Sequence, residues 1–276
     1  MWSVDHVKTF CINLDRRPDR WEAVMNQPAV KKFPNLERFP GVDGKTLDVN
    51  TDPRISTLCR YNIKNFTRRS HDMLDTIGGV GCALSHIGLW TKLVNSSDNV
   101  FLILEDDILI EDKQWDNVRM LFARDPRLAD STTWDIWSLG RIHCLEEMGV
   151  KPADRNVVED KWQQCQQFVG LNAYFISRTG AQKLLKDVYP IQQHIDWYIT
   201  YYGQTKPFKI IHNKLVNYWQ RGTGSDIAVK DKCIICDVPT TVEKSHYILP
   251  IENTNATVLA ALSLAFVIWI ALARKS

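Results

Sequence analysis

The sequence LILEDDILI, residues 102–110, places three acidic residues between two apolar blocks. Together with the preceding residues from Asn99, the first block forms an apolar run that predicts a strand buried on both faces of a sheet. Three carboxylates at the end of such a strand repel one another. Either a positive group shares their site, or they face water as an ordinary solvated strand end.

The composition of the chain is that of a globular protein. Its 276 residues are 45% hydrophobic and 24% charged, enough for one large or two small domains with a buried core. The formal net charge of +2 does not suit the concentrated basic face of a general nucleic-acid binder, so we expect no nucleic-acid partner. The 7 cysteines are scattered and odd in number, which argues against a disulfide framework and favours a reducing compartment.

A long apolar segment lies near the C-terminus. No charged residue occurs from Asn253 to Ala273, and a helix of about 20 residues spans the ~30 Å hydrocarbon layer. We therefore expect a main domain over residues 1–250 and a single transmembrane helix over residues 253–273, the alternative being a buried terminal helix. No apolar leader is visible at the N-terminus, which predicts a tail anchor with a cytosolic main domain, although Arg274 and Lys275 by themselves favour a cytosolic C-terminus.

Strand patterns alternate with helix patterns along the chain. The expected strands cover residues 7–14, 99–104, 134–140 and 170–176. Asp15 is expected to cap a helix that has Pro18 in its first turn, a second helix should follow Gly81, and Ser177 should cap a third. This alternation predicts an α/β fold with a largely parallel sheet, in which ligands bind beyond the carboxyl ends of strands.

Two charged features point to the same chemistry. Arg16, Arg17 and Arg20 crowd the turn before the first helix, where free backbone amides make a phosphate site plausible; the alternative is a solvated basic helix start. Mg²⁺ and Mn²⁺ take oxygen ligands and often share them with phosphates. Acids at a strand end near a phosphate-binding turn therefore suit a metal–diphosphate complex.

Several short motifs, taken in order, resemble those of glycosyltransferase family 25. They are Asn13-Leu14 with the three arginines, Val42-Asp43-Gly44, Gly81-Cys82-Ala83-Leu84-Ser85-His86, the acidic stretch, Trp134-Asp135-Ile136 with Leu139-Gly140, Ala173 to Arg178 with Gly180-Ala181, Ile195-Asp196, and Gln220 with Ser225-Asp226-Ile227. The resemblance covers residues 7 to about 228.

The resemblance implies a fold and a reaction. Members of the family resemble lipopolysaccharide-chain glycosyltransferases and collagen galactosyltransferases. They imply a GT-A-type nucleotide-diphospho-sugar transferase fold with helices on both faces of the sheet, a UDP-sugar donor, and Mn²⁺ or Mg²⁺. We therefore expect a metal-dependent enzyme that moves a hexose, galactose or glucose, to a hydroxyl of a glycan, a lipid-linked glycan or a protein, with inversion. The alternative is a catalytically inactive, membrane-anchored binding or assembly protein that keeps the fold.

The resemblance also implies site residues. The expected nucleotide-sugar contacts are Asn13, Arg16, Arg20, Asp43, Ser85, His86, Glu105 and Asp106. Asp107 is the expected metal ligand, and Asp226 and His212 compete as a further one, although a lone histidine after a strand is also typical of a structural role.

The expected catalytic base is Asp196. Inversion requires a carboxylate on the acceptor side of the donor sugar, away from the acids that hold metal and donor. Asp196 matches the late Ile-Asp motif of the family and is the best remaining acid. The alternative is that Asp196 only caps the helix that follows.

Overall fold

The computed structural model describes residues 2–65, 70, 72–140, 157–158, 162–164, 170–213, 215–216 and 219–220. All of them belong to the first of the two units into which the chain divides, Met1–Pro239. The predictions for Asp226, for the domain boundary at residue 250 and for the segment 253–273 lie outside these residues.

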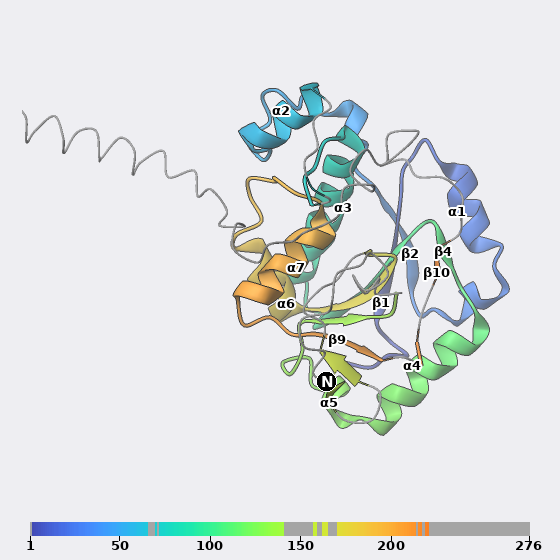
Figure 1. Ribbon diagram of the computed structural model, residues 1–276. Coiled ribbons are helices and arrows are strands. Elements are labelled where there is room, and N and C mark those ends of the chain that lie inside the picture. The colour runs from blue at the N-terminus through green and yellow to red at the C-terminus, as the bar shows by residue number, and fades with distance from the viewer. Residues whose placement is uncertain are drawn as a thin grey trace, which may run out of the picture. The chain divides into compact units, whose positions relative to one another are not determined.

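One eight-stranded sheet forms the centre of this unit, with strand order β2-β1-β3-β8-β5-β9-β7-β6 (Figure 1). Its strands are β1 (Lys8–Asn13), β2 (Leu36–Pro40), β3 (Val100–Glu105), β5 (Ile136–Ser138), β6 (Val157–Val158), β7 (Trp162–Gln164), β8 (Ala173–Ser177) and β9 (Ile210–Asn213), while β4 (Ile108–Leu109) and β10 (Trp219–Gln220) form a separate pair. The helices are α1 (Pro18–Met25), α2 (Thr57–Asn65), α3 (Ile77–Val94), α4 (Asp112–Arg124), α5 (Pro126–Ala129), α6 (Arg178–Leu185) and α7 (Ile195–Thr205), with short 3₁₀ turns η1 (Pro28–Lys32) and η2 (Gly44–Thr46).

The sheet is mixed, so the prediction of a largely parallel sheet was wrong. β1 runs parallel to β2 and β3, and β5 runs parallel to β9. β8 lies between β3 and β5 and is antiparallel to both, and the β7 pairings with β9 and β6 are antiparallel too. All five residues of β8 are buried. A strand buried on both faces is continuously apolar whichever way it runs, so its pattern does not reveal its direction.

Helices cover both faces of the sheet, as expected. Phe101 and Ile103 of β3 pack into a core with α3, α6 and α7, whereas Leu102 and Leu104 pack into a second core with α1 and α4. Figure 1 shows α3, α6 and α7 on one side of the sheet and α1 and α4 on the other. The prediction that β3 is buried on both faces is confirmed, and the acidic stretch therefore lies at the end of a strand that is enclosed by both cores.

The predicted helix starts were right in one case and wrong in another. Ser177 caps α6, and its hydroxyl accepts a hydrogen bond from the Gly180 amide at 3.0 Å. α1 begins at Pro18 as expected, but its N-cap position is Arg17, without a side-chain cap. Asp15 instead pairs with Arg38 of β2 at 2.7 Å, because the ion pair offers the carboxylate a cation that local sequence does not reveal.

α3 is a core helix that meets a neighbouring loop backbone to backbone. Its 18 residues are long and apolar enough to cross a membrane, but 61% of this stretch is buried inside the domain. A Cβ on Gly81 would lie 2.4 Å from the Val42 carbonyl oxygen, and one on Gly44 would lie 1.9 Å from that of Ile77. Only glycine permits this approach, which holds the loop 42–44 against the start of α3.

Two glycine substitutions in α3 test this contact. Gly81→Ala is expected to destabilise the fold by about 1–3 kcal/mol, because backbone atoms of the loop must move to admit the methyl group. Gly88→Ala is the matched control: its Cβ would meet only the Phe39 ring at 3.4 Å, and the gain in helix propensity, up to ~1 kcal/mol, should leave stability unchanged or raised. Urea denaturation measures both, and equal effects would contradict the packing argument.

Candidate functional site

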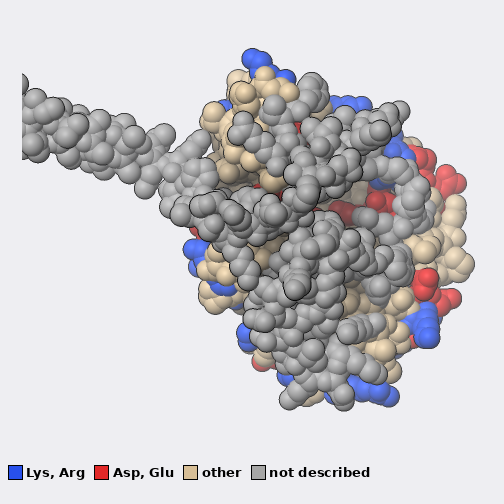
Figure 2. All heavy atoms as spheres, in the orientation of Figure 1, with Lys and Arg blue, Asp and Glu red and all other residues tan. Residues whose placement is uncertain are grey.

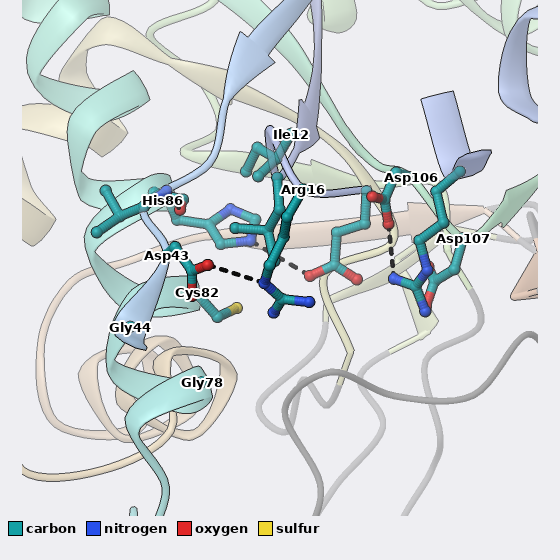
Figure 3. Close-up of a pocket in the computed structure, with 14 residues that line it drawn as sticks. Ile12, Arg16, Asp43, Gly44, Gly78, Cys82, His86, Asp106 and Asp107 are labelled. Atoms are coloured by element: carbon teal, nitrogen blue, oxygen red, sulfur yellow. Dashed lines mark hydrogen bonds and ion pairs between the residues drawn. The ribbon is translucent and has the colours of Figure 1, made fainter. Parts of the chain in front are cut away.

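A cavity opens beyond the carboxyl ends of β1 and β3 (Figure 3). The space between its lining residues, counted together with the solvent at its mouth, is about 650 Å³. Acidic side chains are visible in a hollow on the face drawn in Figure 2. The cavity is lined by Ile12, Leu14, Arg16, Arg20, Val42, Asp43, Gly44, Gly78, Cys82, Ser85, His86, Glu105, Asp106 and Asp107. Eight of the predicted site residues thus meet in one place.

The middle acid of the stretch, Asp106, is held by two side chains. Arg20 of α1 donates to its Oδ1 at 2.8 Å, and Asn13 at the end of β1 donates to its Oδ2 at 2.7 Å. The Arg20 and Asp106 side chains are only 9% and 10% exposed. Burial raises the pKa of Asp106, while the Asn13 and Arg20 contacts act against that rise. These three residues therefore fix the position of the acidic turn.

The third acid, Asp107, is in the opposite situation. Its Oδ1 is buried and has no hydrogen-bond partner among the residues that the structure describes. Burial, followed by the negative charge of Glu105, raises the pKa of Asp107 to about 7. A carboxylate oxygen in this state suits a cation, because a positive charge would relieve both the repulsion and the missing contact.

The first acid, Glu105, faces two side chains of α3. The Nε2 atom of His86 lies 3.3 Å from Glu105 Oε1. Figure 3 shows Cys82 and His86, one helical turn apart, projecting from α3 into the cavity. The ligating atoms of Cys82, His86 and Glu105 lie within 4.8 Å of one another, a spacing that would admit a metal ion. Burial and the charge of Glu105 raise the pKa of the Cys82 thiol well above its usual value, so the thiol is protonated.

The wall opposite the acids is formed by the loop 42–44. Arg16 donates from Nε to Asp43 Oδ2 at 2.8 Å, and both side chains are partly exposed at the cavity (Figure 3). Desolvation opposes ionisation of Asp43, but the Lys45 amide and the Arg16 guanidinium outweigh it and lower the pKa of Asp43. Ser85 accepts from the Val42 amide at 2.8 Å and donates to the Gly81 carbonyl at 2.7 Å. Its hydroxyl therefore holds this loop on α3.

The remaining predicted residues lie elsewhere. Asp196 is in the first turn of α7, where it accepts hydrogen bonds from the amides of Trp197 at 2.8 Å and Gly170 at 3.0 Å. It does not line the cavity, and its helix, α7, packs into the same core as α3. His212 is buried within β9, 3.1 Å from the Ser138 carbonyl oxygen, and β8 and β5 separate β9 from β3.

Sequence reasoning did not assign roles to two residues near the acids. Cys82 belongs to a quoted motif, and its spacing of four residues from His86 would have placed both on one face of a helix. Tyr174 is the second residue of β8, and its hydroxyl is 2.8 Å from His86 Nδ1. No signal in the sequence distinguishes this tyrosine from an ordinary core residue.

Comparison with known proteins gives a consistent result. The family model described as glycosyltransferase family 25 (LPS biosynthesis protein) matches residues 6–199. A glycosyltransferase 25 family member of Drosophila pseudoobscura pseudoobscura is 35% identical over 183 residues, which are 66% of this chain and 27% of the relative. One of Aedes aegypti is 28% identical over 204 residues, 70% of this chain and 30% of the relative. Procollagen galactosyltransferase 1 of Danio rerio is 27% identical over 181 residues, 65% and 28% respectively. The chain thus spans less than a third of the length of these relatives.

Two neighbouring acids are expected to respond in opposite ways to the same substitution. Asp106→Asn should destabilise the fold by about 2–4 kcal/mol, because it removes the counter-charge of the buried Arg20 while leaving an acceptor for its hydrogen bond. Asp107→Asn should stabilise the protein at pH 8 by about 1–3 kcal/mol, because it removes a buried charge that lacks a partner.

The pH dependence checks the second effect. An unfolded Asp107 releases its proton near pH 3.8 and the folded one near pH 7. Between these values the native state holds more protons, so the free energy of unfolding falls as pH rises. The advantage of Asp107→Asn should therefore vanish near pH 4. Urea denaturation with a chelator present measures it, and a difference that is constant from pH 4 to pH 8 would contradict the assignment.

Proposed function

The chain belongs to glycosyltransferase family 25, and from this we propose that it moves a hexose from a UDP-sugar to an acceptor hydroxyl group. One observation carries the proposal: the acidic turn 105–107 and Arg16 line the same cavity. A diphosphate needs cationic groups, and a metal that binds it needs carboxylates. The cavity offers both.

We propose a GT-A-type fold for the catalytic unit. The supporting feature is the parallel order β2-β1-β3, with the acids directly after β3 and the cavity beyond the strand ends. Nucleotides bind at the carboxyl ends of parallel strands in open α/β sheets. The antiparallel β8 does not alter this arrangement, because it lies on the other side of β3.

The residues in the cavity fit a divalent cation. The unpartnered Oδ1 of Asp107 is the observation that supports this fit, and an oxygen ligand suits Mn²⁺ or Mg²⁺. Asp107 would hold the ion. When bound, such an ion offsets the negative charge of the diphosphate leaving group. His212 lies three strands from Ile103, about 14 Å at the usual strand spacing, so the structure does not favour it as a second ligand; Asp226 stays a prediction.

The other cavity residues would orient the donor. Arg16, released from Asp43, would bind the diphosphate, and Asp43 would then be free to accept hydrogen bonds from the ribose. Glu105 would face the donor sugar. Asn13, Arg20 and Ser85 would act indirectly in this proposal, because their polar groups hold Asp106 and the loop 42–44 in place.

We propose Asp196 as the base of an inverting transfer. The acceptor oxygen attacks the anomeric carbon, the bond from that carbon to the diphosphate oxygen breaks, and the acceptor proton passes to the Asp196 carboxylate. Asp196 suits this role because it lies on α7, which packs into the same core as α3, and not among the three acids. Both of its oxygens accept hydrogen bonds from backbone amides, which would hold the carboxylate in a fixed orientation.

The donor and acceptor are proposed by class. The name of the zebrafish relative supports galactose as the sugar, with glucose as the close alternative. The acceptor would be a glycan, a lipid-linked glycan or a protein hydroxyl.

We also propose that the uncharged segment 253–273 attaches the chain to a membrane. Extraction of membranes with alkaline carbonate tests this attachment, and release of the full chain into the supernatant would contradict it.

The donor and metal are tested together. The full chain is expected to release UDP from one member of a UDP-sugar panel with Mn²⁺ present and to stop when a chelator is added. Asp107→Asn should lower this rate by about 100-fold or more, as loss of one strong electrostatic contact does, while Asp116→Asn on the exposed face of α4 should not change it. Full activity in excess chelator would contradict the metal, and donor binding without turnover would indicate a binding protein.

A second substitution tests the base. Asp196→Asn keeps an acceptor oxygen for the backbone amides but cannot take a proton. Sugar transfer is expected to fall by about 10²–10⁴-fold, the usual contribution of general-base catalysis, with donor affinity and stability near those of the wild type. A variant that transfers sugar at the wild-type rate would show that Asp196 only secures the start of α7 and Gly170.

A further inference from the structure

A buried chain of hydrogen bonds leads from the core to Glu105. The indole Nε1 of Trp90 lies 3.0 Å from the Tyr174 hydroxyl, which lies 2.8 Å from His86 Nδ1. His86 Nε2 completes the chain, 3.3 Å from Glu105 Oε1. Trp90, Tyr174 and His86 are each at most 1% exposed, so water does not offer them alternative partners.

The chain has a direction because its first member can only donate. An indole N–H has no acceptor lone pair in the ring plane, so Trp90 donates to the Tyr174 oxygen. Burial raises the pKa of Tyr174 well above its usual value, so the phenol keeps its proton. Among the described residues, this hydroxyl lies within hydrogen-bonding distance of Trp90 and His86. The Tyr174 proton therefore goes to His86 Nδ1.

This direction determines the tautomer of His86. If Nδ1 accepts a hydrogen bond, the ring proton of a neutral imidazole is on Nε2. Nε2–H then donates to Glu105 Oε1. The Nδ1–H tautomer or the imidazolium would put a proton on Nδ1 and leave the buried Tyr174 hydroxyl without an acceptor, which a buried polar group tolerates poorly.

We propose that Trp90, Tyr174 and His86 form a positioning chain that fixes His86 as the Nε2–H tautomer and so orients the Glu105 carboxylate toward the donor sugar. Tyr174 and His86 are positioning residues in this proposal, which rests on the proposed sugar transfer for its functional half only. The tautomer of His86 also determines whether the cluster of Cys82, His86 and Glu105 is a metal centre. A metal ion bound to His86 would need the lone pair of Nε2. In the proposed tautomer Nε2 carries a proton, so the cluster is a hydrogen-bonded group rather than a metal centre.

The tautomer can be measured independently of activity. In the full chain labelled with ¹⁵N-histidine, NMR distinguishes the tautomers through long-range correlations between the two ring nitrogens and the protons on the carbon atoms of the imidazole ring. The His86 signals are identified by their loss in His86→Gln. The expected pattern is Nε2–H in the wild type at neutral pH without added metal. An Nδ1–H or imidazolium pattern would overturn the proposal.

Substitutions then test the direction and the function of the chain. Tyr174→Phe keeps the ring but removes the donor, so His86 should shift toward a mixture of tautomers and kcat should fall by about 10- to 100-fold, as for loss of an outer hydrogen-bond partner, with donor KM changed little. Trp90→Phe should keep the Nε2–H pattern, because Tyr174 still donates to His86. A shift in Trp90→Phe without one in Tyr174→Phe would overturn the direction.

A matched control separates this effect from loss of stability. Tyr198→Phe also removes a tyrosine hydrogen bond, the partly buried one to the Leu184 carbonyl, which lies in α6 away from the cavity. It should change neither the His86 pattern nor the kcat. An unchanged kcat in Tyr174→Phe would overturn the positioning role. If the wild type shows the Nε2–H pattern but transfers no sugar, the proposed function fails while the tautomer assignment stands.

Discussion

The ion pair between Arg20 and Asp106 is the interaction on which the site depends. β3 ends at Glu105, and the carboxylates of Asp106 and Asp107 follow directly, so three negative charges meet at one cavity. Arg20 and Asn13 take both oxygens of the middle acid. A buried ion pair adds little net stability, but it is costly to break, so its main effect is on geometry. Because Asp106 is held from α1 and β1, the chain turns at a fixed point, and both Glu105 and Asp107 line the cavity.

The cavity that results is lined by both carboxylates and guanidinium groups. Glu105 and Asp107 would repel a diphosphate that came alone, and Arg16 and Arg20 would weaken the binding of a cation that came alone. A cation and a diphosphate together satisfy both kinds of group. This reasoning explains why the Arg16–Asp43 contact matters: it keeps the arginine at the cavity with its side chain partly exposed, where an incoming phosphate can compete with the Asp43 carboxylate.

Local patterns predicted the parts of this structure that depend on neighbours in sequence. The burial of β3, the start of α1 at Pro18 and the Ser177 cap follow from residues within one turn or one strand. The parts that were missed depend on distant partners. Arg20 and Asp106 are separated by 86 positions, Asp15 is drawn to Arg38, and the direction of β8 is set by its neighbours in the sheet. Tyr174 shows the same limit, because a strand pattern predicts that its ring is buried but does not reveal the partner of its hydroxyl.

Several motif residues of α3 and the acidic turn have structural roles, and this affects what a motif can prove. Gly81 and Ser85 hold the loop 42–44, and Asp106 holds the turn. A binding protein that had lost catalysis would need these residues as much as an enzyme does. Asp107 is different. Its buried oxygen has no partner among the described residues and its pKa is raised to about 7, so as a bare carboxylate it weakens the fold at neutral pH. A side chain that opposes folding indicates a ligand that compensates for it. Among the residues described, Asp107 therefore indicates a bound cation more strongly than the motifs that surround it.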